Sequence, residues 1–594
     1  MRKHLAHATL PLALGLLLLA AYHLTYGRYF PNAAGFLGHD YSLTLPDLLD
    51  GYFWFRQNGL VEIPWFTPSF CGGQAFFADP QRTYYNLGQF LSFFVGPLQG
   101  IYLTLLTLAA AGFFCMYWLA GRTLGLSRPA ALCAATLFMF NGFFSHRMII
   151  GHYGFHGFML IPLLGILLLG RKPLPCRLEI PAAALLLGYW VQSGYGTLIV
   201  PSGLSLLALA AVAFRNSPQG FGQFMLRGTL AACLALLICS NKLYANVQLM
   251  SHFPRSEYLL PGFAAAGDVL EVSFQALFYS SEHTFRTASP LIHNVQWAIM
   301  PHEWAYGLTL VPLALLLGGL AAPFLHRNAA GAASRPRVLD LLTLALLLLP
   351  LALQYYSPAW NALLKSLPII KTTASPFRWL LLYLPLLCLA AAWAVDRLGE
   401  PWRRLALVLT VLLVPLLNHL ERETYYSEQN YDPAPIEQAY QAVVSGAQQP
   451  AIHGLLLDLP RIWPRNDYLT QGISPLLCYN PLFGYRLENY PAGPFRNGPI
   501  DPGDNGEFLN LRNPACLLYP EENQCAPGNA FRRSERDAAL AFASYHPYAF
   551  EQPAGQQVAN GVSQTVLCLV LVWLLSAVAL ALRTRMFRRV SRDT

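Results

Sequence analysis

Hydrophobic positions along this chain come in long runs that polar segments separate. Apolar runs of about 17 residues or more recur along most of the sequence, and a run of that length crosses roughly 30 Å of hydrocarbon as a helix. The pattern therefore predicts a polytopic α-helical membrane protein with about twelve transmembrane helices, near residues 8–26, 100–120, 129–145, 156–170, 179–195, 198–214, 228–248, 306–324, 339–356, 378–396, 404–418 and 563–582.

Three longer polar segments interrupt this pattern, at residues 27–99, 249–305 and 419–562. The last of them is rich in Pro, Asn, Gly and Tyr and contains short strand-like runs at residues 454–458 and 474–479. We expect it to form a small α/β or irregular cap domain that leans on the loops beneath it. The predicted domains are a transmembrane core over residues 1–418, the cap over 419–562, and a final transmembrane helix with a basic cytoplasmic tail over 563–594.

Composition supports the membrane assignment and predicts an orientation. Hydrophobic residues make up 55% of the chain and charged residues only 12%, about half the charged fraction of a typical soluble domain. Lys and Arg gather in the short loops on one side, and cytoplasmic loops hold most such residues. The long polar segments are thus predicted to lie outside the cytoplasm, in a bacterial inner-membrane protein with both termini inside. The net charge of +8 reflects this topology and contact with anionic lipid, and no nucleic-acid partner is expected.

Four cysteines fall in the segments predicted to lie outside, where disulfides form. Cys516 and Cys525 have eight residues between them, and we predict that they form a local disulfide. Cys71 in the first outer loop and Cys478 in the cap offer a second pair, but sequence alone leaves their connectivity open. The spacing lacks paired C-x-x-C elements, so it indicates no metal site, and no cofactor is predicted.

The first outer loop carries the leading candidate for chemistry, Asp40, within GHDYSLTLP (38–46) and a few residues beyond the first span. A carboxylate there is placed to act as a general base toward an acceptor hydroxyl at the lipid surface. Asp40 is equally well explained as the N-cap of a helix, and both interpretations stand. Asp47 and Asp50 are predicted to face solvent, and the aromatic run 52–55 predicts a helix lying in the membrane interface.

The same loop holds a second candidate base, Asp79, within PWFTPSFCGGQAFFADPQRTYYN (64–86). Asp79 precedes a proline, so an Asx-turn is the structural alternative to a catalytic role. Arg82 is a candidate ligand for a donor phosphate, and a bridge between Asp79 and Arg82 explains the pair nearly as well. Tyr84 in this loop and Tyr41 beside Asp40 are candidate substrate contacts.

Basic residues at the outer ends of other spans are candidates to bind a phosphate or pyrophosphate group. Cations gathered at that level neutralise a phosphate leaving group, and the candidates are Arg147, Lys242, Lys371 and Arg378. Snorkelling of Arg378 to the interface and helix–helix bonding around Lys242 are the structural alternatives.

Histidines and one glutamate at the same level are candidate substrate-binding residues, namely His152, His156, His302 and Glu303. The H-x-x-x-H spacing of the first two would place them on one helical face, but the glycines around them argue against a helix and a metal pair there. Glu303, within MPHEWAYGLTLVP, is placed either to position a sugar hydroxyl or to cap a helix.

The order of these features resembles the GT-C superfamily of integral-membrane glycosyltransferases: a span, a long outer loop with the early acidic residue of GHDY and the later PWFTPSFCGGQAFFADPQ, many further spans, and an outer C-terminal region. The resemblance covers the whole topology, while its residue motif is short. It implies a lipid-phosphate-linked sugar donor and an acidic base in the first outer loop, here Asp40 or else Asp79. Members that use polyprenyl monophosphate sugars often need no metal. The chain lacks a WWD-type motif, and its cap precedes a final span, which favours transfer of a single sugar.

The expected function is therefore transfer of one sugar from a polyprenyl-phosphate donor to an extracytoplasmic acceptor: a cell-envelope glycan, a lipid or a surface protein such as pilin. The expected partners are this donor, the acceptor and membrane lipids. Two other classes stay open, a lipid or polysaccharide transporter or flippase, and a non-catalytic envelope assembly factor. A transporter should show polar breaks at the membrane midplane, whereas an enzyme should gather its charged groups at the outer interface.

Overall fold

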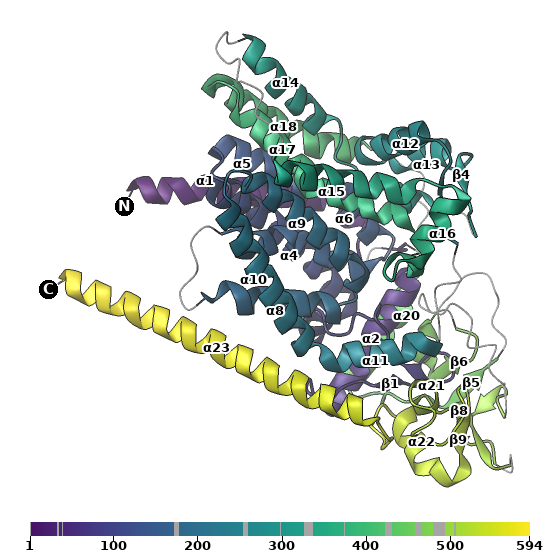
Figure 1. The fold of residues 1–594 in the computed structure, drawn as a ribbon. Coiled ribbons are helices and arrows are strands. Elements are labelled where there is room, and N and C mark those ends of the chain that lie inside the picture. Colours follow the sequence, from purple (N-terminus) through teal and green to yellow (C-terminus); the bar gives the residue numbers. More distant parts are fainter. Residues whose placement is uncertain are drawn as a thin grey trace.

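In the computed structural model the chain is mainly helical (Figure 1). The structure describes residues 2–593 apart from 32–34, 39, 171–176, 253–258, 297–298, 326–336, 374, 422–429, 458–465, 479–493 and 504–505. The α-helices of the body are α1 (Arg2–Tyr26), α2 (Tyr41–Asn58), α3 (Leu87–Val95), α4 (Pro97–Trp118), α5 (Arg128–Met139), α6 (Gly142–Ile149), α7 (Ile161–Leu169), α8 (Glu179–Gln192), α9 (Ile199–Ala213), α10 (Pro218–Ile238), α11 (Ser240–His252), α12 (Ala266–Phe278), α13 (Ser281–Ala288), α14 (Val311–Leu325), α15 (Val338–Gln354), α16 (Pro358–Ser366), α17 (Tyr383–Asp396), α18 (Glu400–Leu420) and α23 (Ala554–Asp593).

Seven of the described helical segments are long and apolar enough to cross a membrane: Thr9–Tyr29, Pro97–Thr123, Gly196–Ala213, Pro218–Ile238, Pro376–Asp396, Glu400–Leu420 and Ala554–Leu580. Shorter apolar helical stretches are Tyr153–Leu169, Val311–Ala321 and Val338–Gln354. Each of the twelve predicted spans overlaps at least one helix. The chain is thus a helical membrane protein, while twelve as the number of crossings stays a prediction.

Some predicted span boundaries are wrong: residues 129–145, for example, cover most of α5, a break and the start of α6. The span expected near residues 228–248 begins at Pro218, and α10 gives way to the separate helix α11 before that range ends. The pattern placed Arg227 in a loop because a charge within an apolar helix is costly. In the structure Arg227 is buried in α10, 3.7 Å from Glu179, and donates to the carbonyl of Gly170. These partners on neighbouring segments offset the cost of burying the charge.

Both chain ends lie on one side of the molecule in Figure 1, at the ends of α1 and α23. Strands β5 (Gly454–Leu456), β6 (Ile473–Pro475), β8 (Phe508–Arg512) and β9 (Ala530–Arg532) and helix α22 (Arg536–Ala543) lie on the opposite side, and α23 runs from them back toward the side of the N-terminus. In the interior of the helical body, α5 packs against both α4 and α17. Leucines on the outer face of α18, such as Leu405 and Leu412, are exposed, as expected for a surface that faces lipid.

The predicted cap region, residues 419–562, contains short strands and helices. Strand β5 (Gly454–Leu456) lies between β6 (Ile473–Pro475), to which it is parallel, and β7 (Gly498–Pro499), to which it is antiparallel. Strands β8 (Phe508–Arg512) and β9 (Ala530–Arg532) form a second, antiparallel pair. The helices are α20 (Ala434–Val444), α21 (Ala515–Leu518) and α22 (Arg536–Ala543). Four further short strands lie in the polar segments 27–99 and 249–305, β1 (Phe66–Thr67) paired with β2 (Gln74–Ala75), and β3 (Gly262–Phe263) paired with β4 (Ile292–His293).

The described residues contain two disulfides. The predicted bond between Cys516 and Cys525 is confirmed. Cys71 is bonded to Cys478, which joins the first outer loop to the cap region across 407 residues of sequence. Next to this bond the amide of Gly72 donates to Ser474 Oγ at 3.1 Å. The first outer loop is therefore held to the cap region by covalent and polar contacts.

The aromatic run on α2 is buried beneath the cap region. Residues 52–55 have side chains between 2% and 4% exposed. The ring centroid of Tyr52 lies 4.9 Å from that of Tyr440, and the centroid of Phe53 lies 5.4 Å from that of Tyr545. Phe55 packs against Tyr85 in the segment 27–99, so the run is covered by protein on more than one side. Its location in the membrane interface stays a prediction.

Candidate functional site

The carboxylate of Asp40 is hydrogen-bonded to a histidine on another segment. Asp40 occupies the N-cap position of α2, yet its side chain makes no capping hydrogen bond. Its Oδ2 instead lies 2.6 Å from Nε2 of His152. The interpretation of Asp40 as a side-chain N-cap is therefore wrong.

Two glycines let the backbones around Asp40 and His152 approach each other. Gly151 has φ of +88°, and a Cβ atom on it would lie 2.7 Å from the carbonyl carbon of Asp40. A Cβ on Gly38 would lie 2.5 Å from the carbonyl oxygen of Ile149. A side chain at either position would push the two segments apart, so glycine is required for this contact.

Hydrogen bonds fasten the start of α2 to the turn that follows α6. The hydroxyl of Tyr41 donates to the carbonyl of Met148 at 2.6 Å, and Thr44 Oγ1 donates to the carbonyl of Gly151 at 2.9 Å. Tyr41, predicted as a substrate contact, is fully buried and uses its hydroxyl in this structural bond. This bond ties the first residue of α2, which follows Asp40 in the chain, to α6.

A buried glutamate connects this histidine contact to two arginines. Arg147, near the end of α6, places Nη1 3.2 Å from Nδ1 of His152 and donates through Nη2 to Glu303 Oε2 at 2.9 Å. Arg378, in the 3₁₀ helix η8 (Pro376–Leu382), donates through Nε to Glu303 Oε2 at 3.0 Å. Ser375 Oγ donates to the same oxygen at 3.0 Å. Glu303 thus accepts from two guanidinium groups and one hydroxyl.

Aromatic rings complete this network. The guanidinium carbons of Arg147 and Arg378 lie 5.5 Å and 5.2 Å from the ring centroid of Phe155, so both cations contact the same ring. The ring of His302, in η6 (Pro301–Trp304), lies 4.8 Å from that of His152 in an edge-to-face arrangement. We call Asp40, Arg147, His152, His302, Glu303 and Arg378 the Asp40 cluster.

Charges within the Asp40 cluster determine its protonation. Burial opposes ionisation of Glu303, but Arg147 and Arg378 outweigh it and hold the pKa of this carboxyl well below its usual range. Burial lowers the pKa of His152, and burial together with His152 and Arg147 lowers that of His302. At neutral pH both histidines are therefore neutral, and Glu303 is ionised.

Exposure within the cluster is uneven. The side chains of Asp40 and Arg378 are 30% and 32% exposed, whereas that of Arg147 is fully buried. Asp40 and Arg378 are thus the charged members that an incoming molecule can reach. Together they offer a proton acceptor and an anion-binding group close to the same network.

The second predicted base, Asp79, lies in a different cluster. Asp79 is 1% exposed, and its Oδ2 lies 3.3 Å from Nε of Arg82, which also contacts Asp47. Lys242 Nζ lies 3.4 Å from the hydroxyl of Tyr84 and interacts electrostatically with Asp79. Burial lowers the pKa of Lys242 to about 8. The bridge between Asp79 and Arg82 that the sequence offered as the structural alternative is present, and this cluster is buried.

The prediction that Asp47 and Asp50 face solvent is wrong. Asp47 binds Arg82, and Asp50 is 1% exposed and accepts hydrogen bonds from the hydroxyls of Thr67 and Ser69. Burial raises the pKa of Asp47 to about 6 and that of Asp50 to about 7. The helical pattern showed a polar face, but the first outer loop folds back over it.

Two further predicted residues lie outside the Asp40 cluster. His156 is fully buried, with Nδ1 2.6 Å from the carbonyl oxygen of Tyr153 and Nε2 2.6 Å from the hydroxyl of Tyr189. Both nitrogens are thus engaged in packing contacts within the fold. Lys371 is exposed in the 3₁₀ turn Ile370–Thr372.

Sequence reasoning missed Ser375 and Phe155, which hold Glu303 and both arginines in place. Neither residue type signals a site, since buried Ser and Phe are common in any core. Ser375 lies three residues before Arg378, which the sequence indicated as a candidate. That closeness to a candidate cation is the one signal by which Ser375 could have been found.

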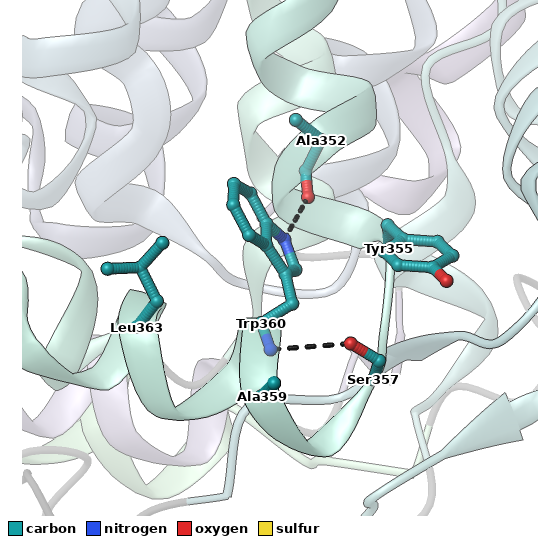
Figure 2. Close-up of a pocket in the computed structure, with 6 residues that line it drawn as sticks. All are labelled: Ala352, Tyr355, Ser357, Ala359, Trp360 and Leu363. Carbon is teal, nitrogen blue, oxygen red and sulfur yellow. Dashed lines mark hydrogen bonds between the residues drawn. The ribbon is translucent and has the colours of Figure 1, made fainter.

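A groove on the surface lies elsewhere, where α15 ends and α16 begins (Figure 2). Its volume is about 650 Å³, and it is lined by Ala352, Tyr355, Ser357, Ala359, Trp360 and Leu363. Trp360 Nε1 donates to the carbonyl of Ala352 at 2.8 Å, and the amide of Trp360 donates to Ser357 Oγ at 3.3 Å. The groove is mainly apolar, and none of its lining residues belongs to the Asp40 cluster.

No protein-family model matches the chain, and the comparison with curated proteins finds no significant match.

Proposed function

We propose that this protein is a membrane glycosyltransferase of the GT-C type, which moves one sugar from a polyprenyl-phosphate donor to an extracytoplasmic acceptor. The observation that carries the proposal is that two partly exposed residues, Asp40 and Arg378, belong to one network, in which His152, Arg147 and Glu303 connect them. Asp40 follows the first span in sequence, as the general base does in the superfamily that the topology resembles. The proposal includes twelve crossings of a bacterial inner membrane, with the Asp40 cluster on the periplasmic side.

In the proposed reaction, Asp40 is the general base. An acceptor hydroxyl oxygen attacks the anomeric carbon of the donor sugar while its proton passes to the carboxylate of Asp40. The bond from the anomeric carbon to the phosphate oxygen breaks, and the electron pair leaves with the polyprenyl phosphate. Bond formation on the face opposite the leaving group inverts the anomeric centre.

Arg378 stabilises the departing phosphate in this proposal. Its guanidinium is the partly exposed cation of the cluster. Glu303 fixes its orientation through three contacts, from Nε to Oε1 at 3.2 Å, from Nε to Oε2 at 3.0 Å and from Nη2 to Oε1 at 2.5 Å. A guanidinium held in advance needs little reorganisation when negative charge develops on the leaving oxygen. Arg147 contributes to the field of the site but is buried, and the exposed Lys371 adds positive charge nearby in sequence.

The cap region binds the acceptor in this proposal. It is held to the first outer loop by the bond between Cys71 and Cys478, and that loop also supplies Asp40. The disulfide would thus keep an acceptor bound by the cap region close to the loop that carries Asp40. The acceptor class is a cell-envelope glycan, a lipid or a surface protein.

The test is sugar transfer by the purified protein in lipid vesicles, with polyprenyl-phosphate-linked sugars as donors and cell-envelope fractions as acceptors. Asp40→Asn keeps the shape of the side chain but loses its basicity, and we expect transfer to fall by roughly 100-fold or more. Asp537→Asn, an exposed Asp in α22, is the matched control and should transfer normally. Full transfer by Asp40→Asn would overturn the assignment of the base.

Two other classes give different outcomes in the same vesicles. A flippase would move a labelled lipid-linked sugar between leaflets without forming a new glycosidic bond. A non-catalytic assembly factor would do neither, and its Asp40→Asn variant would support envelope assembly in cells as well as the unaltered protein does. Gathering of charged groups around the first outer loop favours the enzyme over these alternatives.

A further inference from the structure

The contacts of His152 determine which of its ring nitrogens carries the proton. Nδ1 lies 3.2 Å from Nη1 of Arg147, and a guanidinium group can only donate hydrogen bonds. Nδ1 must therefore accept, which leaves the proton of the neutral ring on Nε2. That nitrogen lies 2.6 Å from Oδ2 of Asp40, so the Nε2–H group donates to the carboxylate.

We propose that Arg147 selects this tautomer and that His152 acts as a positioning residue, which donates through Nε2 to Asp40 and holds its carboxylate ionised and oriented. This inference rests on the proposed function of Asp40 as the base. It goes beyond that function because it assigns distinct roles to two residues that touch neither the donor nor the acceptor.

Arg147 is held rigidly enough to impose the tautomer. Its side chain is fully buried and donates to Glu303 at 2.9 Å. Its guanidinium carbon also lies 5.7 Å and 5.5 Å from the ring centroids of Phe143 and Phe155. The backbone contributes as well, since the amide of His152 donates to the carbonyl of Arg147 at 2.9 Å.

The arrangement excludes His152 as the base. In a Ser-His-Asp triad the histidine accepts the proton at Nε2, while the carboxylate holds Nδ1–H. Here Nε2 already bears the proton, and the lone pair of Nδ1 faces Arg147. The proton of the acceptor hydroxyl therefore goes to Asp40 and leaves from there to solvent, without passing through the imidazole.

Burial is the main reason that the imidazole stays neutral. Burial lowers the pKa of His152, and the guanidinium groups of Arg147 and Arg378 lower it further, against the opposing effect of Asp40. His302 and Glu303 are the remaining ionisable groups of η6 that face this pair. A neutral ring donates a single hydrogen bond toward Asp40 at physiological pH.

The first experiment measures transfer as a function of pH in three forms of the full chain. His152→Phe keeps a ring but removes the donor, and we expect kcat to fall roughly 10-fold or more, because hydrogen bonds to charged groups are among the stronger ones. The carboxylate form of Asp40 loses stabilisation, so the acidic limb of the kcat profile should move to higher pH. His152→Gln places an N–H group near the position of Nε2 and should restore most of kcat and the original limb.

A purely structural role of His152 would lower activity without moving the acidic limb, and that outcome would overturn the proposal. An equal fall of kcat in His152→Gln and His152→Phe would also overturn it, provided that both variants have the unfolding temperature of the unaltered protein. The KM for the donor should stay unchanged, since His152 is not assigned to donor binding.

The second experiment reads the tautomer without any assay of transfer. Nitrogen-15 NMR of the histidine rings, with the His152 signals assigned by their loss in His152→Phe, should show a protonated Nε2 and a bare Nδ1. In Arg147→Met the His152 ring should lose its preference for the tautomer that carries the proton on Nε2. A proton on Nδ1 in the unaltered protein would overturn the inference and leave the proposed base untouched, whereas full transfer by Asp40→Asn would overturn the base and leave the tautomer result standing.

Discussion

Gly151 stands directly against the backbone of Asp40, at the point where the turn after α6 meets the start of α2. A Cβ atom on Gly151 would lie 2.7 Å from the carbonyl carbon of Asp40 and 2.5 Å from the amide nitrogen of Tyr41. The φ of +88° at Gly151 is also a conformation that other residues rarely adopt. This close approach brings the next residue, His152, within hydrogen-bond distance of the Asp40 carboxylate.

Gly151→Ala should therefore separate Asp40 from His152. The added methyl group clashes with backbone atoms, and the left-handed conformation costs roughly 1–2 kcal/mol for a residue with a Cβ. A displacement of about 1 Å at a catalytic group costs on the order of 100-fold in rate, so we expect transfer to fall by 10- to 100-fold. Gly203→Ala, in α9 with open space around it, is the control and should transfer sugar normally. Equal activity of the two variants would contradict the role of Gly151.

Glu303→Gln should destabilise the fold. The substitution leaves the guanidinium groups of Arg147 and Arg378 without their carboxylate, and removing one partner of a buried ion pair costs about 3–5 kcal/mol. Since Arg378 is partly exposed, we expect the lower end of that range. Thermal unfolding in detergent measures the loss, with Glu271→Gln on the exposed face of α12 as the control.

The contribution of Glu303 to stability should also depend on pH. Its pKa in the folded protein is well below the ordinary value of 4.5, mainly because Arg147 and Arg378 overcome the effect of burial. The stabilisation is therefore present above about pH 4.5 and is lost as the pH falls toward the folded-state pKa. The unaltered protein should lose stability in acid more steeply than Glu303→Gln. Parallel acid profiles would contradict the ion pairs.

The contribution of Asp50 to stability should change with pH in the direction opposite to that of Glu303, and Asp50→Asn removes it. Burial raises the pKa of Asp50 to about 7 from an ordinary 3.8, so the folded protein holds the proton more tightly than the unfolded chain. The stabilisation is full below about pH 3.8 and is lost as the pH rises through 7. Between pH 6 and 8 the free energy of unfolding of the unaltered protein should fall by about 1 kcal/mol relative to that of Asp50→Asn. Unfolding temperatures of both proteins across this range test the prediction, and Asp537→Asn should follow the unaltered protein.

Reporter fusions test the proposed orientation. A reporter placed after Arg397, between α17 and α18, should read cytoplasmic, and one placed near Gly503 in the cap region should read extracytoplasmic. The physical reason is the concentration of Lys and Arg in the loops assigned to the cytoplasm. A cytoplasmic signal near Gly503 would place the cap region on the wrong side for the proposed acceptor.

Local sequence patterns predicted the features that depend on near neighbours in the chain. Each predicted span overlaps a helix because a long apolar run satisfies its backbone hydrogen bonds within one segment. The disulfide between Cys516 and Cys525 closes a short loop, and spacing alone indicated it. The six residues that meet in the Asp40 cluster were all singled out from their residue types and their positions near span ends. What each one contacts was not predicted.

Tertiary structure alone decided the roles of those residues. Asp40 is a partner of His152 and not a side-chain cap, Asp79 is half of a buried ion pair, and Asp50 lies beneath the first outer loop. The sequence determined which segments become helices, because that choice follows from apolar length and local hydrogen bonding. It did not determine which polar side chains face water, because the burial of Asp47, Asp50 and Arg227 depends on segments far along the chain that fold over them and supply their partners.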